Sequence, residues 1–366
     1  MKNYLINFLK FSLFLGVGLG IFYLVYTKQA AAYQEQCIID NIPAADCNLV
    51  EKIISDFRSV QYFWIFMVLL AFTISNYSRA ARWLMLMHPL GYRPRLINAF
   101  FTVIIGYFAN LGLPRVGEVI RAGMIAQYEK MAPEKVMGTI VVSRMMDVLS
   151  LLVVIGLAFI LEFDRLWNYL SGYLTKFMGN MGATLSFVLP FFFGSMLLGL
   201  GLIYYFRKTL MQWTLVQKIR AILLGFKEGL QTIGQLERPW LFLFHTVNIW
   251  VMYFLMTYLS FFAFAPTAAL GPVAGLMVFV FGAFGIVIPS PGGLGPYHFL
   301  VVEALALYNI GGDDAFSFAN ILFFSVQIGC NVILGILSLV LLPIINRAYE
   351  PAHLTKPQVR VESPAS

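Results

Sequence analysis

Long apolar runs separated by short charged segments dominate the chain. Residues 59–78, 96–114, 239–302 and 316–346 contain no Lys, Arg, Asp or Glu. A helix needs roughly 20 apolar residues to cross about 30 Å of hydrocarbon, and each run reaches or approaches that length. Because the runs lack the alternating polar and apolar positions of an outer-membrane barrel strand, the pattern predicts membrane-spanning helices.

Six segments are predicted to cross the membrane fully: residues 11–26, 60–81, 136–161, 185–206, 239–264 and 316–345. The first segment also fits the core of a cleaved signal peptide, because Ala30, Ala31 and Ala32 follow it. We favour an uncleaved helix, since the run is long for a signal core. A helix that starts in the cytoplasm also places the basic loops between the later spans on the cytoplasmic side.

Two further apolar segments are expected to enter and leave the membrane on the same side. Residues 96–114 lie between Arg95 and the basic pair Arg115 and Arg121, and residues 268–308 have a centre rich in Pro and Gly. Both predict re-entrant hairpins of broken helices, which membranes tolerate where protein buries the backbone or water reaches it. Two interrupted segments with opposite entry sides favour an inverted repeat. The alternative is that the glycines only allow close helix packing and the prolines only kink helices.

The positions of the basic residues orient the chain. With the N-terminus inside, 19 Lys and Arg fall in cytoplasmic segments, five fall outside, and Arg144 lies within a span. This bias follows the positive-inside rule, so both termini are predicted to be cytoplasmic, in a bacterial inner membrane. Residues 1–346 then form a single all-α polytopic membrane domain, in which residues 28–58 make an extracytoplasmic loop. Residues 209–234 are predicted to be an interfacial helix, and residues 347–366 a short cytoplasmic tail.

Composition supports a membrane protein and argues against other classes. Hydrophobic residues make up 60% of the chain and charged residues 12%, about half the charged fraction of an average soluble domain. The net charge of +7 does not indicate nucleic-acid binding, because the basic residues follow the predicted topology. Attraction of these residues to anionic lipid headgroups is compatible with that topology.

Cysteine and histidine positions indicate no metal site and no cofactor. The four histidines are scattered, and no Cys–His or paired-carboxylate spacing occurs. Cys37 and Cys47 share the predicted outer loop, where either a disulfide or two free thiols are compatible with the sequence. No nucleotide-binding motif is present, so we do not expect direct drive by ATP.

One pair of charges lies inside an otherwise apolar span. Arg144 and Asp147 are three residues apart, so they share a helix face and can neutralise each other. An ionisable residue at membrane depth is a functional-site hypothesis by default. We expect the pair to face a polar cavity near Arg115 and Glu118. The alternative is an interfacial pair that extends toward the cytoplasmic surface.

A second cluster lies where the 60–81 span reaches the cytoplasm. Arg79 and Arg82 share a helix face near Asn76 and Trp83. Guanidinium groups make bidentate contacts with phosphate, so these arginines, with Arg115 and Arg121, are candidates for a clamp on a headgroup phosphate. Ordinary topology anchors beside an interfacial Trp would give the same pattern.

Several motifs occur together in a fixed order along the chain. They are Asn76, Arg79, Arg82 and Trp83; Gly106, Tyr107 and Asn110, followed by Arg115, Gly117, Glu118 and Arg121; Arg144 and Asp147; and Pro291, Gly292, Gly293, Leu294 and Gly295. On these motifs the chain resembles, over nearly its whole length, the flippase-like membrane family typified by the transmembrane region of lysylphosphatidylglycerol synthases. The resemblance implies a protein that moves or handles a lipid. In the best understood members, that lipid is an aminoacylated phospholipid.

The chain departs from the family pattern at three places. Leu113, Pro114 and Arg115 stand where the family usually has Pro-Gly-Arg, and Ser143 stands where Glu is frequent. His298 occupies a position that is commonly Glu, so a proton-relay or amine-binding role of that acid does not carry over, although a histidine titrates near neutral pH. Residues 347–366 are too few for the aminoacyl-transfer domain of the fused members. We therefore do not expect the chain to synthesise lysyl-lipid.

The sequence therefore predicts a translocase for a phosphate-headgroup lipid and not an enzyme. The candidate substrate-binding residues are Asn76, Arg79, Arg82, Asn110, Arg115, Glu118, Arg121, Arg144, Asp147, Gly292, Gly293, Gly295 and His298. The expected partners are an anionic or aminoacylated phospholipid, or a polyprenyl phosphate. The first alternative is a membrane subunit or enzyme of polyprenyl-phosphate-linked glycolipid and envelope assembly, acting with envelope-biosynthesis enzymes and a positioned acid or base. A scaffold whose polar residues only join helices is the second.

Overall fold

The computed structural model describes residues 2–39, 43, 47–112, 116–168, 171, 236–288, 290 and 293–351. The chain divides into two compact units, residues 1–158 with 240–366 and residues 159–239. Within the described ranges all regular structure is helical. The sequence prediction of an all-α chain is confirmed for these ranges.

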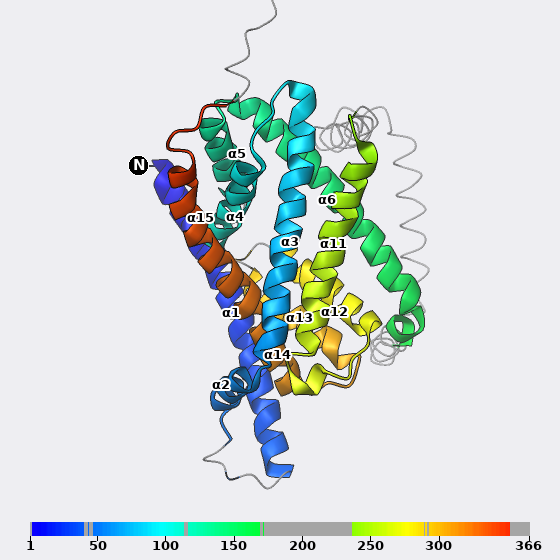
Figure 1. Ribbon diagram of the computed structural model, residues 1–366. Coiled ribbons are helices and arrows are strands. Elements are labelled where there is room, and N and C mark those ends of the chain that lie inside the picture. Colours follow the sequence, from blue (N-terminus) through cyan, green and yellow to red (C-terminus); the bar gives the residue numbers. More distant parts are fainter. Residues whose placement is uncertain are drawn as a thin grey trace, which may run out of the picture. The chain divides into compact units, whose positions relative to one another are not determined.

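The first unit contains nearly all the described helices (Figure 1). They are α1 (Lys2–Ile39), α2 (Leu49–Ser59), α3 (Tyr62–Met87), η1 (His88–Leu90), α4 (Leu96–Gly112), α5 (Val116–Tyr128), α6 (Pro133–Leu161), α11 (Pro239–Phe261), η2 (Ala265–Thr267), α12 (Pro272–Val287), α13 (Pro296–Ala306), α14 (Gly312–Phe323), the π-helical segment η4 (Phe324–Cys330) and α15 (Asn331–Ile345). The last three form one continuous helical rod, and α6 and α11 each cross the boundary between the two units.

Four of the described helical segments are long and apolar enough to cross a membrane. They are Tyr62–Leu90, Pro133–Leu161, Pro239–Phe261 and Gly312–Ile345, and they match the predicted spans 60–81, 136–161, 239–264 and 316–345. The chain is therefore a multi-pass helical membrane protein. The predicted span 11–26 lies within the 38-residue helix α1. Residues 185–206 and the predicted interfacial helix 209–234 lie outside the described residues, so the total of six spans stays a prediction.

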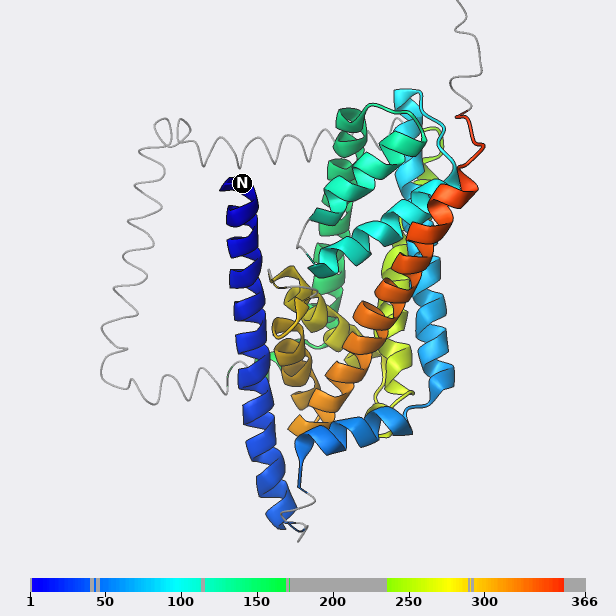
Figure 2. The same ribbon diagram turned by 90° about the vertical axis from the view of Figure 1, so that its left-hand side faces the viewer.

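The segment 96–114, predicted as the first hairpin, contains one helix, α4, and its partner α5 follows beyond those bounds, whereas the segment 268–308 contains both helices of the second pair. The α4–α5 pair has helices of 17 and 13 residues, and the α12–α13 pair has helices of 16 and 11 residues. At 1.5 Å per residue, the longest of these helices extends about 25 Å. Figures 1 and 2 place the two hairpins in opposite halves of the first unit. The breaks between short helices agree with the prediction, while re-entry and entry from opposite sides of a membrane stay predictions.

Close backbone approach holds each hairpin together. A Cβ atom on Gly117 of α5 would collide with the Gly106 carbonyl oxygen of α4. In the second hairpin, a Cβ atom on Gly285 would lie only 2.5 Å from the Tyr297 Cα atom. Only a residue without a side chain fits at these crossings. These glycines therefore act as packing positions between the paired helices.

The turn of the second hairpin requires two glycines for a different reason. Gly293 and Gly295 have φ angles of +85° and +87°, in the left-handed region that residues with a Cβ atom rarely adopt. Gly292, which the sequence grouped with them, lies outside the described residues. A helix break at this place is thus specified by backbone conformation as well as by the prolines around it.

Residues 28–58, the predicted outer loop, are largely helical. Residues up to Ile39 continue α1, and α2 begins after Asn48, whose side-chain oxygen accepts a hydrogen bond from the Val50 amide at 2.9 Å. A disulfide joins Cys37 to Cys47 and so connects the end of α1 to the segment before α2. In Figure 2, α2 lies across one end of the helical bundle.

An ion-pair network fixes α2 against the start of α14. Lys52 Nζ lies 2.9 Å from Asp56, 2.7 Å from Asp314 and 3.5 Å from Asp313. Burial lowers the pKa of Lys52, but the hydrogen bonds and charges of Asp314 and Asp56 outweigh it and raise that pKa above its usual value. Ser317 Oγ donates a further hydrogen bond to Asp56 at 2.6 Å. These contacts order the polar segment that links α1 to α3.

A buried carboxylate connects the open end of the α4–α5 pair to the residues that follow α15. Glu129, fully buried after α5, accepts hydrogen bonds from the Arg95 amide, the Asn98 side chain and the Tyr349 hydroxyl. Asn98 and Asn346 also exchange two side-chain hydrogen bonds at 2.9 and 2.7 Å. The entry of α4 and the exit of α5 are thus held at one point.

We expect Gly117→Ala to disrupt the first hairpin, because the added methyl group would collide with the Gly106 carbonyl. Overpacking of this kind lowers stability by about 1–3 kcal/mol. Gly123→Ala, on the same helix and with open space around its Cβ position, is the matched control. It should be neutral or stabilising by up to about 1 kcal/mol. Thermal unfolding of both purified variants in detergent measures the difference, and equal stability would contradict the packing account.

Candidate functional site

Six ionisable side chains come together in the first unit on α3, α5 and α6. We call them the polar cluster: Arg79, Arg82, Glu118, Arg121, Arg144 and Asp147. Four arginines and two carboxylates give the cluster a formal net charge of +2. Charges at membrane depth are expensive, so such a group marks a functional site by default. An excess of positive charge favours an anionic ligand.

Asp147 bridges two arginines of α3. Its Oδ2 atom lies 2.6 Å from Arg79 Nη1, and its Oδ1 atom lies 2.5 Å from Arg82 Nη2. The Arg82 side chain is fully buried, and the other two are nearly so. The two arginines face Asp147 together because they are three residues apart on one helix. Each carboxylate oxygen therefore offsets one buried guanidinium charge.

Hydroxyl groups accept further hydrogen bonds from these two arginines. Arg79 Nη2 donates to the Tyr253 hydroxyl at 2.9 Å, which in turn lies 3.2 Å from the Tyr107 hydroxyl. Arg82 donates to Ser143 Oγ at 3.0 Å and contacts Thr246 Oγ1 at 3.4 Å. The network thus joins α3 to α4, α6 and α11. Arg79 and Arg82 are thus engaged by protein groups, and their part in the phosphate clamp that the sequence suggested stays a prediction.

Glu118 and Arg144 form the accessible edge of the polar cluster. Glu118 Oε1 lies 2.5 Å from Arg144 Nε, and the two side chains are 32% and 41% exposed. Arg144 Nη1 also lies 3.8 Å from Asp147 Oδ2. The sequence paired Arg144 with Asp147 by their spacing. In the structure the shorter contact of Arg144 is with Glu118, and Asp147 is engaged mainly by the arginines of α3.

Arg121 is stacked on an indole ring. Its guanidinium carbon lies 3.7 Å from the centre of the Trp83 ring, and the residue is only 5% exposed. Trp83 is fixed in turn, because its Nε1 atom donates to Thr139 Oγ1 at 2.8 Å. The Nε and Nη2 atoms of Arg121 are buried and have no hydrogen-bond partner. Arg121 therefore presents an unpaired donor edge inside a positively charged cluster.

The remaining candidate residues lie apart from these contacts. Asn110 Oδ1 accepts from the Gly117 amide at 2.8 Å and so supports the start of α5, while the Asn76 side chain bonds within its own helix. His298 is fully buried, 5.0 Å from the Phe22 ring and 4.8 Å from the Phe323 ring. Its described ring contacts involve no member of the polar cluster. Arg115 and Gly292 lie outside the described residues.

Sequence reasoning did not place the uncharged residues of the network in the site, although it named Tyr107 in a motif and Ser143 beside Arg144. Tyr107, Tyr253, Ser143 and Thr246 complete the contacts of Arg79 and Arg82. A signal for two of them exists, because Thr246 and Tyr253 are seven residues apart and so share one face of α11. Polar side chains repeated at this interval in an apolar span indicate a buried polar face.

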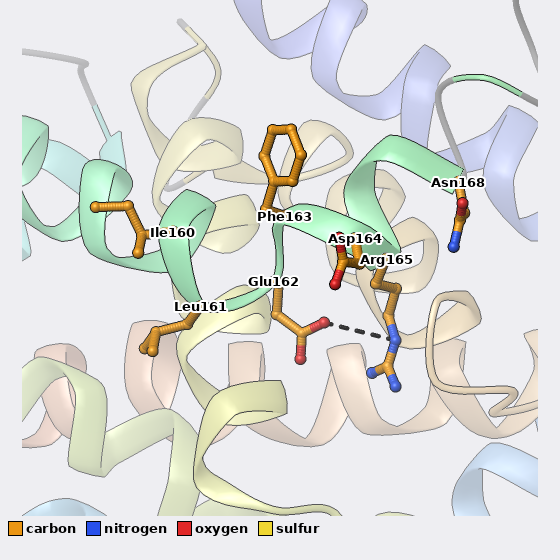
Figure 3. Close-up of a pocket in the computed structure, with 7 residues that line it drawn as sticks. All are labelled: Ile160, Leu161, Glu162, Phe163, Asp164, Arg165 and Asn168. Atoms are coloured by element: carbon orange, nitrogen blue, oxygen red, sulfur yellow. Dashed lines mark ion pairs between the residues drawn. The ribbon is translucent and has the colours of Figure 1, made fainter.

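An open hollow of about 450 Å³ occurs in the second unit, near the end of α6 (Figure 3). It is lined by Ile160, Leu161, Glu162, Phe163, Asp164, Arg165 and Asn168. An ion pair of 3.5 Å joins Arg165 Nε to Glu162 Oε2. None of these residues was a candidate from the sequence, and the hollow contains no member of the polar cluster. In the part of the chain that the structure describes, no group of three or more His, Cys, Asp or Glu is placed to hold a metal ion.

These features define a polytopic α-helical membrane protein with an arginine-rich, carboxylate-bridged site among its helices. The model of the family described as lysylphosphatidylglycerol synthase TM region matches residues 48–335. The chain belongs to this family. The matched region contains every member of the polar cluster and both hairpins. No curated protein and no solved structure matches the chain.

We expect Asp147→Asn to destabilise the protein strongly, because Arg79 and Arg82 would stay buried without a counter charge. Breaking a buried ion pair from one side costs about 3–5 kcal/mol. Asp164→Asn, at an exposed position, is the control and should leave stability unchanged. Thermal unfolding followed by tryptophan fluorescence measures both variants. Equal unfolding temperatures would show that Asp147 does not anchor the two arginines.

Proposed function

We propose that the protein translocates a lipid with a phosphate headgroup between the leaflets of the bacterial cytoplasmic membrane. The observation that carries this proposal is the net positive polar cluster, which lies among apolar helices and has a partly exposed edge. The family takes its name from the membrane region of lysylphosphatidylglycerol synthases, and lysylphosphatidylglycerol is a phospholipid that carries a lysyl group. An anionic or aminoacylated phospholipid, or a polyprenyl phosphate, fits the charge of the site.

The two hairpins supply a route by which a headgroup reaches the polar cluster. In this proposal they are re-entrant and enter from opposite leaflets, as their opposite placement in the first unit suggests. Broken helices are tolerated at membrane depth where they line a polar path. Opposed broken helices are also typical of inverted-repeat transporters, whose sites lie between the repeats. Both termini are then cytoplasmic, and the turn that contains Gly293 and Gly295 lies toward the path from the other leaflet.

The engaged state of the carboxylates favours binding over catalysis. A membrane enzyme of glycolipid assembly needs an acid or base that is positioned to exchange a proton with its substrate. Asp147 is bridged by two arginines, and Glu118 is paired with Arg144. His298 is enclosed by aromatic rings. We therefore place translocation ahead of a role in polyprenyl-phosphate-linked envelope assembly.

Leaflet exchange in liposomes tests the proposal. The purified protein is reconstituted with fluorescent phospholipids or polyprenyl phosphates, and the fraction of label accessible from outside is followed over time. We expect wild-type exchange to fall to the protein-free rate in Glu118→Ala and in Arg144→Ala, because each removes one half of the accessible ion pair. Glu134→Ala and Arg58→Ala, both at exposed positions outside the cluster, should exchange lipid as the wild type does.

Two outcomes would contradict the proposal. The first is normal exchange by folded Glu118→Ala and Arg144→Ala. The second is no exchange of any tested lipid by a folded wild-type protein. Copurification of a stable transferase, together with the second outcome, would favour the envelope-assembly role.

A further inference from the structure

The four arginines of the polar cluster are not equivalent as ligand-binding groups. Arg79 and Arg82 each donate a short hydrogen bond to Asp147, and Arg144 donates one to Glu118. Arg79 and Arg82 lack a partner at Nε alone, whereas Arg121 lacks one at both Nε and Nη2 although the residue is 95% buried. A buried charged donor without a partner is strongly unfavourable. Arg121 is therefore the arginine whose hydrogen-bonding capacity awaits a ligand.

The two unpaired atoms form one edge of the guanidinium group. Nε and Nη2 present parallel N–H bonds, and this edge matches two oxygens of a phosphate in a bidentate contact. Stacking on Trp83 holds the plane of the group, so little side-chain freedom is lost on binding. The hairpin packing fixes its position as well, because the space at Gly106 is bounded by the Arg121 Cβ atom.

The charges around Arg121 also favour an anion. Arg79, Arg144 and Asp147 all lie within electrostatic range of Arg121. Asp147 is already bridged by two arginines, so it leaves the charge of Arg121 uncompensated. Two positive charges of the cluster as a whole remain unbalanced. A phosphate monoester or diester would neutralise one or both of them.

Glu118 belongs to the accessible edge of the polar cluster and lies on the same helix as Arg121. It precedes Arg121 by three residues on α5, so both side chains share one helix face. Its carboxylate occupies Arg144, which is the most exposed arginine of the cluster. An anion that enters from this edge reaches Arg144, which is already paired with Glu118. Glu118 is thus an internal competitor for the same positive charge.

Resting on the proposed function, we infer that Arg121 binds the phosphate group of the ligand in a bidentate contact, and that this phosphate displaces Glu118 from Arg144. The chemistry recognised is a phosphate monoester or diester. The competing carboxylate then keeps weaker anions out of the site and returns to Arg144 when the phosphate leaves. A lipid headgroup and free phosphate share this chemistry, so the experiment must separate the two sources.

Calorimetric titration of the full chain in an uncharged detergent tests the inference. The three probes are dihexanoyl phosphatidylglycerol, inorganic phosphate, and dihexanoylglycerol, which lacks phosphate. We expect Arg121→Lys to weaken phosphatidylglycerol binding at least about tenfold, because a lysine makes neither the bidentate contact nor the same stacking. Glu118→Gln should tighten binding about threefold, because removing the competitor frees Arg144. Arg58→Lys, on the exposed face of α2, is the matched control and should bind as the wild type does.

The Glu118→Gln result keeps the test independent of folding, because a misfolded variant does not gain affinity. Tighter phosphatidylglycerol than phosphate binding, with no heat from dihexanoylglycerol, would identify a lipid headgroup as the ligand. Equal binding of both anions would support the same site with phosphate alone as the recognised group. Wild-type affinity in Arg121→Lys, or weaker binding in Glu118→Gln, would overturn the inference.

The outcomes separate this inference from the proposed function. Binding that depends on Arg121 without any leaflet exchange would leave the phosphate site in place and reject translocation. Leaflet exchange that depends on Glu118 and Arg144, with unchanged phosphate binding in Arg121→Lys, would support translocation and reject Arg121 as the binding residue.

Discussion

The bridging of Arg79 and Arg82 by Asp147 is the interaction on which the site depends. Buried guanidinium groups among apolar helices need a nearby counter charge, and one carboxylate supplies an oxygen to each. The bridge fixes α3 against α6, and the hydroxyls of Tyr253 and Thr246 extend it to α11. Because this carboxylate is engaged on both oxygens, the positive charge of the remaining arginines is opposed mainly by Glu118. The structural bridge thereby leaves a net positive site open to an anion.

The polar cluster contains a buried ion-pair bridge at Asp147 and a partly exposed ion pair between Glu118 and Arg144. The Asp147 bridge is buried, so breaking it would leave the guanidinium charges of Arg79 and Arg82 with neither a counter charge nor water around them. The Glu118 and Arg144 pair is partly exposed, and exposed pairs contribute little net stability. An incoming phosphate can therefore replace Glu118 at small cost. Arg121 lies on the same short helix as Glu118, and the close approach of Gly106 and Gly117 holds that helix against α4. The first hairpin thus carries both the binding arginine and its competitor.

The sequence was sufficient to predict an all-helical membrane protein and four of its long apolar helices. Apolar runs of about 20 residues predicted six spanning helices, because the membrane imposes that length, and four of them are found among the described residues. Glycines and prolines predicted the helix breaks. The proximity of Arg144 to Glu118 was expected. The bridge from Asp147 to Arg79 and Arg82 was not, because local spacing suggested Arg144 for Asp147, whereas these partners lie 68 and 65 residues away. Tyr253 was also missed: its spacing from Thr246 indicates a polar face of α11, but local sequence does not show that its partner Arg79 lies on α3.

An experimental structure of the protein in lipid nanodiscs that contain phosphatidylglycerol would test the central claim most directly. We predict a headgroup phosphate within about 3 Å of the Arg121 Nε and Nη2 atoms, with Asp147 still bridging Arg79 and Arg82. Glu118 should then be separated from Arg144. A phosphate bound to Arg79 or Arg82 with Asp147 released would contradict the account. So would an anionic lipid that is resolved elsewhere while Arg121 contacts only protein.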